Sequence, residues 1–277
     1  MKPAPFGYAA ASSVEEALAL LAAPDARPLA GGQSLVPLLN FRLARPSLLV
    51  DLNPVVELAS CQATADALRI GAMTRQAALL RSGEVAERWP LLTQALAHVG
   101  HTATRSRGTL GGSVAHADPR AELPVALAAL GARFHVRGRG GDRALTAAEM
   151  FVGPYTTALR EGELLVEVEV PSPPPGARMA FLEHARTHGD FALGGVAVVL
   201  APGVHAAIAL LGAGPVPIRV PVAERALLDG SGPAHAAELA TAEIADDYRR
   251  ALLATLAERA LVSCLNFPNT TPGAVAG

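Results

Sequence analysis

The residues most suited to ligand chemistry lie in a glycine-rich stretch, Gly108–Pro119. Its paired glycines, Gly111 and Gly112, remove side chains where a backbone must approach something closely. The hydroxyl groups of Thr109 and Ser113, together with backbone N–H groups, are expected to face anionic oxygens. The stretch therefore predicts a cradle for a phosphate-containing ligand.

A second glycine-rich stretch, Ala30–Leu35, lies much earlier in the chain. Arg105 and Arg107 add positive charge just before the first stretch, and Glu122 beyond it can accept hydrogen bonds from sugar or ring donors. Two such loops predict one long ligand that carries more than one phosphate. Each loop taken alone is also typical of an ordinary turn.

Several common catalytic sites are missing from the sequence. It contains no GxSxG nucleophile elbow, no zinc-binding HExxH helix and no GxxxxGK[ST] phosphate loop. His98, His101 and His116 flank the first stretch without forming a recognisable triad, so we assign no catalytic residue and no metal ligand. The two cysteines, Cys61 and Cys264, are too few for a [2Fe–2S] cluster, which needs a full set of protein ligands.

Length and composition favour two modest domains. The chain has 277 residues, a net charge of −2 and 17% charged residues, so nothing in it favours binding to nucleic acid or to an anionic membrane. The first residues lack the apolar core of a signal peptide, which predicts a cytoplasmic protein. The apolar run from Phe191 to Gly214 is broken by glycine and proline, so we interpret it as two buried strands rather than a membrane span.

Hydrophobic patterning predicts a mixture of helices and strands. Ser34 and Thr74 are expected to cap helices, and Ser12–Glu15 and Thr146–Glu149 resemble capping boxes. Pro171–Gly176 is the clearest linker, and we place a domain boundary there. Helices are expected at 16–21, 35–39, 75–80, 90–99, 122–130, 222–228, 234–244 and 247–262, and strands at 27–29, 47–52, 58–64, 68–73, 134–136, 143–145, 163–170, 179–185, 192–200 and 205–211.

Both glycine-rich stretches resemble the FAD loops of the medium, flavin-carrying subunits of molybdenum hydroxylases, the carbon monoxide dehydrogenase and xanthine dehydrogenase group. Ala30–Pro37, followed by Arg42–Pro46, is similar to the first loop of that family. Thr104–Pro119 is similar to the second loop, which is written around an R-N-R-G-T-[IL]-G-G-S core. The resemblance continues through Gly189–Leu193 and Tyr248–Arg250, and therefore covers nearly the whole chain.

The resemblance implies an α+β fold with two domains. Residues 1–172 would form an FAD-binding domain of two α/β subdomains, of the vanillyl-alcohol-oxidase or PCMH type. Residues 177–277 would form a carbon monoxide dehydrogenase flavoprotein-like domain, a small sheet packed with helices. The residues that the resemblance assigns to FAD are Ala30, Gly31, Gly32, Gln33, Ser34, Leu35, Val99, Thr109, Gly111, Gly112, Ser113, Asp118, Glu122 and Leu165.

Three further positions follow from the resemblance. Phe191 is implied to pack near the isoalloxazine ring. Ser106 replaces the asparagine that is common between the two arginines of the second loop, and Leu182 stands where xanthine dehydrogenases carry a lysine. The second departure bears on the chemistry of the electron acceptor.

The function implied is electron transfer. FAD would accept electrons from [2Fe–2S] clusters in a small partner subunit and pass them to an external acceptor, while a large molybdopterin subunit oxidises the substrate, in a heterotrimer that is expected to dimerise. Two alternatives stay open: a free-standing FAD oxidase of the same fold, and a scaffold subunit that has lost FAD. The lack of an obvious substrate domain argues against the first, and the intact glycine loops argue against the second.

Overall fold

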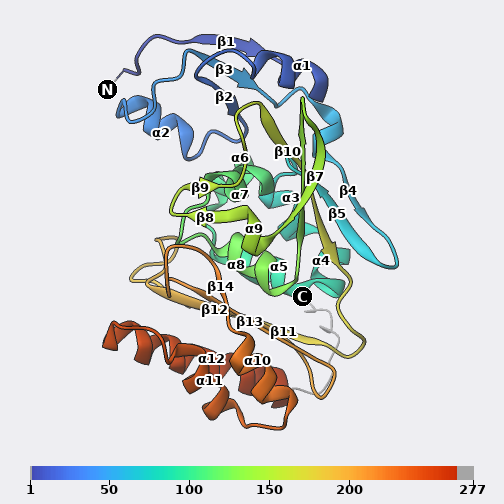
Figure 1. Cartoon of the computed structure of the whole chain (residues 1–277), viewed down its shortest axis with the longest axis vertical. Coiled ribbons are helices and arrows are strands. Elements are labelled where there is room, and N and C mark those ends of the chain that lie inside the picture. The colour runs from blue at the N-terminus through green and yellow to red at the C-terminus, as the bar shows by residue number, and fades with distance from the viewer. Residues whose placement is uncertain (1, 267–277) are drawn as a thin grey trace, which may run out of the picture.

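The computed structural model describes residues 2–266, in which three sheets and their covering helices follow one another along the long axis (Figure 1). The first sheet is parallel, with the order β1–β3–β2. The second and third are antiparallel, with the orders β4–β5–β10–β6–β7 and β11–β12–β13–β14, and β8 and β9 form a short ribbon. The strands are β1 Gly7–Ala10, β2 Ala26–Leu29, β3 Leu48–Asp51, β4 Cys61–Ala63, β5 Ala67–Gly71, β6 Arg133–Gly138, β7 Gly141–Thr146, β8 Phe151–Gly153, β9 Thr156–Thr157, β10 Glu163–Pro171, β11 Arg178–His184, β12 Gly194–Ala201, β13 His205–Leu211 and β14 Ile218–Arg219.

The helices cover these sheets and fill the space between them. In Figure 1, α1 and α2 accompany the first sheet at the top, and α10, α11 and α12 lie below the third sheet at the bottom. None of the helices within residues 2–266 is both long and apolar enough to cross a membrane. The helices are α1 Val14–Leu20, α2 Leu35–Asn40, the 3₁₀ turn η1 Val56–Ala59, α3 Gln76–Arg81, α4 Gly83–Arg88, α5 Pro90–His98, α6 Thr102–Arg107, α7 Leu110–His116, α8 Glu122–Ala129, α9 Ala147–Met150, α10 Pro221–Leu228, α11 Pro233–Thr241 and α12 Asp247–Asn266.

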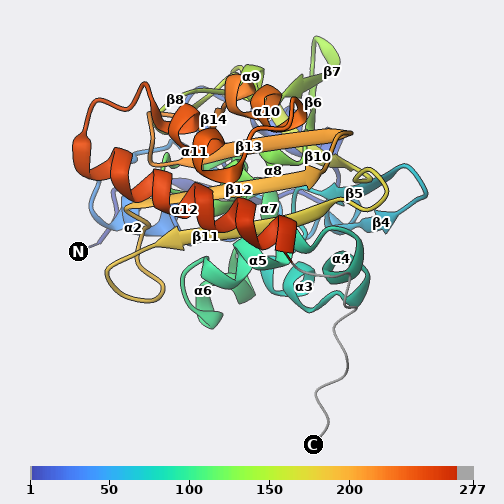
Figure 2. The same ribbon diagram turned by 90° about the horizontal axis from the view of Figure 1, so that it is seen from below.

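The third sheet is buried on both faces. Ala197 and Val199 of β12 pack into the same core as α5 and α8, whereas Val196 and Val198 pack against the C-terminal helices. This alternation follows from the two-residue repeat of a strand. In the view of Figure 2, α12 crosses the sheet beside β11 and β12. The apolar run that could have suggested a membrane span is thus the β12–β13 hairpin, as the sequence predicted.

Most predicted elements are present, with ends that differ by a few residues. The turn at Gly138–Asp142, the helix that begins at Pro90 and the capping box at Thr146 are confirmed. The strand expected at 58–64 begins only at Cys61, because the chain first makes the turn η1. The helices α4 and α6 and the strand β1 were not predicted.

Two predicted helix caps are wrong, and a third lacks its hydrogen bond. Ser34 does occupy the N-cap position of α2, but it has helical backbone angles and its side chain makes no cap hydrogen bond. Thr74 instead donates its hydroxyl to the carbonyl of Ser60, and Arg75 occupies the cap position of α3. At α1 the cap is Ser13, one residue later than expected, with Glu16 accepting from Ser12.

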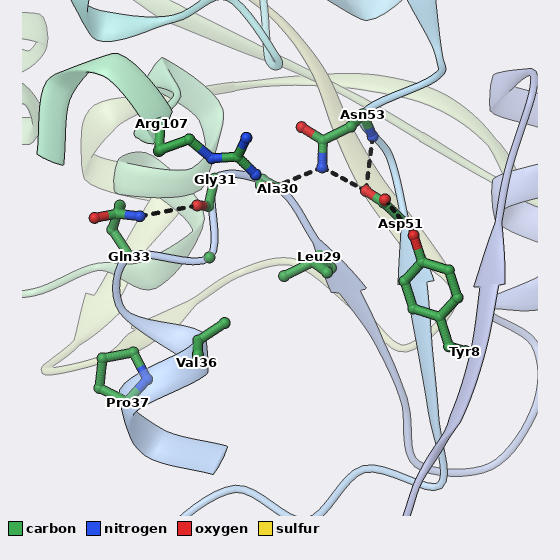
Figure 3. A pocket seen from close by; sticks show the side chains of 11 residues that line it. Tyr8, Leu29, Ala30, Gly31, Gln33, Val36, Pro37, Asp51, Asn53 and Arg107 are labelled. Atoms are coloured by element: carbon green, nitrogen blue, oxygen red, sulfur yellow. Dashed lines mark hydrogen bonds between the residues drawn. The ribbon is translucent and has the colours of Figure 1, made fainter. Parts of the chain in front are cut away.

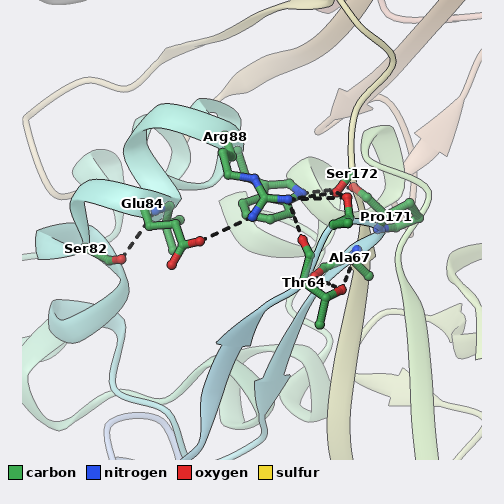
Figure 4. A network of polar contacts seen from close by, with 10 residues as sticks. Thr64, Ala67, Ser82, Glu84, Arg88, Pro171 and Ser172 are labelled. Carbon is green, nitrogen blue, oxygen red and sulfur yellow. Dashed lines mark hydrogen bonds and ion pairs between the residues drawn. The ribbon is translucent and has the colours of Figure 1, made fainter.

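An arginine network fixes the end of β10 beside α4 (Figure 4). The Arg88 guanidinium pairs with Glu84 at 3.2 Å, donates to the carbonyl of Thr64 and to Ser172 Oγ, and lies 4.3 Å from the centre of the Trp89 ring. Trp89 itself is fully buried, and its indole N–H donates to the carbonyl of Pro171 at 2.9 Å. The start of the predicted linker is therefore held in place, and the chain turns from there into β11.

The start of α7 is packed closely against the segment that follows β5. The amides of Leu110 and Gly111 donate to the carbonyls of Thr74 and Ala72 at 3.0 and 2.9 Å. A Cβ atom at Gly111 would lie only 2.5 Å from Cβ of Ala72. Only glycine permits this approach, so Gly111 serves the packing of protein against protein rather than direct access to a ligand.

We expect Gly111→Ala to lower the free energy of unfolding by about 1–3 kcal/mol, because the added methyl group overpacks a backbone contact. Urea denaturation measures this change. Gly140→Ala is the matched control, since no atom lies within 4 Å of its added Cβ, and it should leave the stability almost unchanged. Equal stabilities of the two variants would contradict the close packing of α7.

Candidate functional site

All of the residues that the sequence assigned to FAD line one cavity of about 540 Å³. They come from separate parts of the chain: the β2–α2 loop, the end of α5, the start of α7, the start of α8 and β10. The β11–β12 loop adds Gly189, Asp190 and Phe191 to the same wall. Phe191 is 61% exposed, which is unusual for a phenylalanine unless another surface or a ligand covers it.

The β2–α2 loop offers backbone donors at this cavity. Gly32 has a φ angle of +74°, which glycine adopts without strain. None of the hydrogen bonds found within residues 2–266 is donated by the backbone N–H groups of Gly32, Gln33 or Ser34. Consecutive free amides beside a left-handed residue form the kind of concave site that binds anions.

The second glycine-rich stretch is largely a helix rather than the extended loop that we expected. Thr109 is its N-cap: it is 2% exposed, and its Oγ1 accepts from the amide of Gly112 at 3.1 Å. The expectation of a free Thr109 hydroxyl was therefore wrong, because the helix start uses it. Gly112 faces the other loop, since a Cβ on it would lie 3.5 Å from Cβ of Ala30. Ser113 is half-buried and lines the cavity.

The arginines before this helix are placed differently from the prediction. Arg105 donates to the carbonyls of Val99 and Gly100, which fixes the turn between α5 and α6. Arg107 lies on the opposite side of the β2–α2 loop (Figure 3). The cationic side chain that does line the cavity is Arg27 of β2, which the sequence analysis missed because it lies inside a predicted strand.

A second cavity of about 550 Å³ lies on the side of the β2–α2 loop that faces Tyr8, Asp51 and Asn53 (Figure 3). A polar network of these residues supports the loop from this side. Asn53 Nδ2 donates to the carbonyl of Ala30 at 3.1 Å, and Tyr8 Oη donates to Asp51 Oδ2 at 2.6 Å. Burial alone would raise the pKa of Asp51, but the hydrogen bonds from Tyr8 and Asn53 and the charge of Arg107 lower it overall. The ionised Asp51 carboxylate therefore remains available to hold both partners.

Two buried acids lie in the wall of the first cavity. Asp118 is 7% exposed, and it accepts from the amide of Arg120 at 2.9 Å and from Tyr155 Oη at 3.3 Å. Glu122 is equally buried, and burial raises the pKa of its carboxyl group to about 7. Beside them, burial lowers the pKa of His116, whose ring lies 5.2 Å from that of Tyr155.

Gln76 is a site residue that the sequence analysis missed. It is 4% exposed, lines the cavity, and its Oε1 atom has no hydrogen-bond partner. A buried amide without a partner costs about 1–3 kcal/mol unless a bound molecule satisfies it. Its position in the first turn of a short helix gave no sequence signal, because its burial depends on tertiary contacts such as the one with Gly108.

The two departures from the family pattern lie away from the cavity. Ser106 donates to the carbonyl of Thr102 at 2.8 Å within α6. Leu182 packs with the C-terminal helices on the far face of the third sheet, so it does not line the cavity. Its neighbour Glu183 points to the opposite face, toward α5.

The fold and the cavity together define a class of protein. Free amides at one glycine loop, a helix start at the other, an unpaired buried amide and an apolar wall suit an extended ligand with phosphate, sugar and ring portions. These features fit FAD, whose diphosphate needs close backbone approach and whose ring system needs apolar cover. The site is thus that of a flavoprotein.

Comparisons with known proteins agree with this class. Residues 4–173 match the family model described as FAD binding domain in molybdopterin dehydrogenase. The chain is 42% identical over 285 residues to 6-hydroxypseudooxynicotine dehydrogenase complex subunit alpha of Paenarthrobacter nicotinovorans, with 96% of each chain covered. It is 40% identical over 235 residues to caffeine dehydrogenase subunit beta of a Pseudomonas species, with 82% of this chain and 80% of the relative covered. The solved carbon monoxide dehydrogenase from Hydrogenophaga pseudoflava is similar with a TM-score of 0.91 and 37% identity, over 96% of this chain and 99% of that chain.

The chain belongs to the FAD-binding domain family of molybdopterin dehydrogenases. Its cofactor is FAD, and it is a flavin-dependent oxidoreductase subunit of the molybdenum hydroxylase type. The predicted family, cofactor and α+β fold are thereby confirmed.

We expect Gln76→Leu to weaken FAD binding to the apoprotein about tenfold, because a hydrogen bond to the cofactor is lost. The same change should leave the unfolding free energy of the apoprotein equal or higher, since it removes an unsatisfied buried oxygen. Flavin fluorescence titration and urea denaturation give the two values.

Gln94→Leu is the matched control with the opposite expectation. Gln94 Oε1 accepts from the amide of Phe181 at 2.8 Å, outside the cavity. Its loss should cost about 1–3 kcal/mol of stability and leave the affinity for FAD within about twofold. If Gln76→Leu behaves like this control, Gln76 has only a structural role.

Proposed function

We propose that this chain relays electrons within a multi-subunit molybdenum hydroxylase. The cavity would hold FAD, which would supply electron transfer from [2Fe–2S] clusters of a small partner subunit to an external acceptor, while a large molybdopterin subunit oxidises the substrate. The observation that carries the proposal is the single cavity that gathers both glycine-containing segments, the apolar wall and the orphaned amide of Gln76. The partners form a heterotrimer with this chain, which dimerises and works in the cytoplasm.

The residues of the cavity bind and orient the cofactor, and FAD itself supplies the redox chemistry. The backbone amides of Gly32, Gln33 and Ser34, together with the start of α7 near Ser113, would hold the diphosphate. Val99, Leu165 and Phe191 would cover the ring portions. Asp118 and Glu122 would contact polar groups of the cofactor.

Two features of the chain support a relay rather than a complete enzyme. Its two cysteines supply no ligand set for an iron–sulfur cluster, so electrons must come from another chain. Relatives carry names such as subunit alpha, subunit beta and medium chain, which describe parts of complexes. We further propose that residues 1–172 form the FAD-binding domain and residues 177–277 the second domain, divided where the chain passes from β10 to β11.

The isolated chain should keep its flavin oxidised when it is mixed without oxygen with a panel of aldehydes and N-heterocycles. Its two cysteines are too few to ligate a [2Fe–2S] cluster that could pass electrons from such substrates to FAD. After addition of the iron–sulfur and molybdenum subunits encoded for the same complex, the substrate should bleach the flavin absorbance, and an acceptor dye should restore it. Rapid stoichiometric bleaching of the lone chain would instead establish a free-standing oxidase.

Acid precipitation should release all of the flavin into the supernatant. Neither cysteine lines the cavity, and its one histidine, His116, stacks against Tyr155 at the end of α7. Absorbance of the supernatant at flavin wavelengths measures the release. Flavin that stays with the precipitated protein would show a covalent bond, and a protein that is colourless and cannot be reloaded would support the scaffold alternative.

A further inference from the structure

Three ionisable side chains from three elements lie close enough beside the cavity for their charges to interact. Glu122 is in the first turn of α8, His98 is the last residue of α5, and Glu183 lies on β11 of the third sheet. Glu122 lines the cavity, whereas His98 and Glu183 lie behind its wall. The cluster therefore joins the two parts of the chain on either side of the predicted boundary.

Glu183 and His98 form a pair in which the Glu183 side chain is buried and the His98 side chain is partly exposed. Glu183 Oε1 lies 3.2 Å from His98 Nδ1, and its side chain is only 4% exposed. The hydrogen bond with Glu183 raises the pKa of His98, so that the pair is ionic over a wider pH range. Glu183 Oε2 is buried and has no partner, so its negative charge is only partly compensated.

Glu122 has no comparable partner. No side chain within residues 2–266 donates a hydrogen bond to its carboxyl group. Burial is the main cause of the raised pKa, and the charges of Glu183 and Asp118 add to it, whereas its own backbone N–H and His98 favour the ionised form. A buried carboxylate with so little compensation is costly, and the group lowers this cost by keeping its proton.

We propose that Glu122 meets the cofactor as a neutral carboxylic acid that donates a hydrogen bond to an acceptor atom of FAD, and that FAD binding therefore takes up a proton. The inference rests on FAD binding in this cavity, as assigned above. FAD brings a negatively charged diphosphate and displaces water from the cavity, and both effects disfavour the ionised carboxylate further. A protonated acid can donate where a carboxylate can only accept, so Glu122 selects for an acceptor at this point of the ligand.

The direction of the pH dependence follows from this assignment. In the free protein Glu122 loses its proton as the pH rises through about 7, whereas in the complex it stays protonated. Binding must then recover the proton, so the affinity falls as the pH rises above 7, by up to about tenfold for each pH unit. The other charged groups near Glu122 are Glu183, Asp118 and His98. Asp118 accepts hydrogen bonds from Arg120 and Tyr155, and the hydrogen bond with Glu183 raises the pKa of His98.

The test measures FAD affinity of the full-length apoprotein by fluorescence titration between about pH 6 and about pH 8.5. The wild type should bind more than tenfold more weakly at the upper end than at the lower end. Glu122→Gln, which is neutral at every pH and keeps an N–H donor, should bind FAD with nearly constant affinity. Asp190→Asn is the matched control: Asp190 is an exposed acid in the same wall, and its removal should leave the pH dependence in place.

Calorimetry of the wild type in two buffers with different ionisation enthalpies, at about pH 8, provides a measurement that needs no variant. We expect about one proton to be taken up for each FAD bound. Affinity that is constant across the pH range, with no proton uptake, would overturn the inference. An unchanged pH dependence in Glu122→Gln would also overturn it, because another group such as His98 would then be the one that takes up the proton. Failure to bind FAD at any pH would contradict the cofactor site itself, and is distinguishable from these results.

Discussion

The contact between Gly31 and the carbonyl group of Arg107 is the constraint on which the rest of the structure depends. A Cβ atom at Gly31 would lie 2.3 Å from that oxygen, so the two segments can meet only through glycine. The same carbonyl accepts a hydrogen bond from Arg75, which also holds Asn53 at the end of the first sheet. This oxygen atom thus brings the β2–α2 loop against the end of α6, and residues on both sides of the contact lead into the wall of the cavity.

Further close contacts carry this constraint into the second sheet. Gly71, the last residue of β5, packs against the backbone of Leu58, and a Cβ atom on Gly71 would lie 2.3 Å from the carbonyl oxygen of Leu58. Gly111 packs against Ala72 in the same way. The β11–β12 loop adds Gly189, Asp190 and Phe191 to the wall of the cavity. The third sheet that carries this loop is anchored by Phe181 of β11, which packs into the core shared with α5 and α8. The cavity is therefore a property of the whole chain, and neither half of the sequence contains it alone.

This distribution explains how far the sequence could be interpreted. The alternating apolar residues of 205–211 and the capping box at Thr146 are local signals, and both were predicted correctly. The family resemblance identified residues that do line the cavity, but their roles depend on contacts between distant segments. In the structure Thr109 caps a helix, and Arg105 donates hydrogen bonds to the carbonyls of Val99 and Gly100. Gly111 packs against the backbone of Ala72. Gln76 could not be found, because the residues that bury it come from a loop far away in the sequence.

The polar atoms without partners suggest how the site is maintained. Gln76 lines the cavity and its Oε1 atom is buried without a partner, and Glu183 Oε2 is likewise unpaired behind the cavity wall; neither atom stabilises the apoprotein. Each buried atom of this kind costs about 1–3 kcal/mol in the absence of a ligand. A ligand that binds only the folded state offsets such a cost, since binding adds to the stability of that state. Cofactor binding therefore offsets part of the cost of such atoms, and Gln76, whose unpaired Oε1 can only accept, suits a cofactor that presents a hydrogen-bond donor at this wall of the cavity.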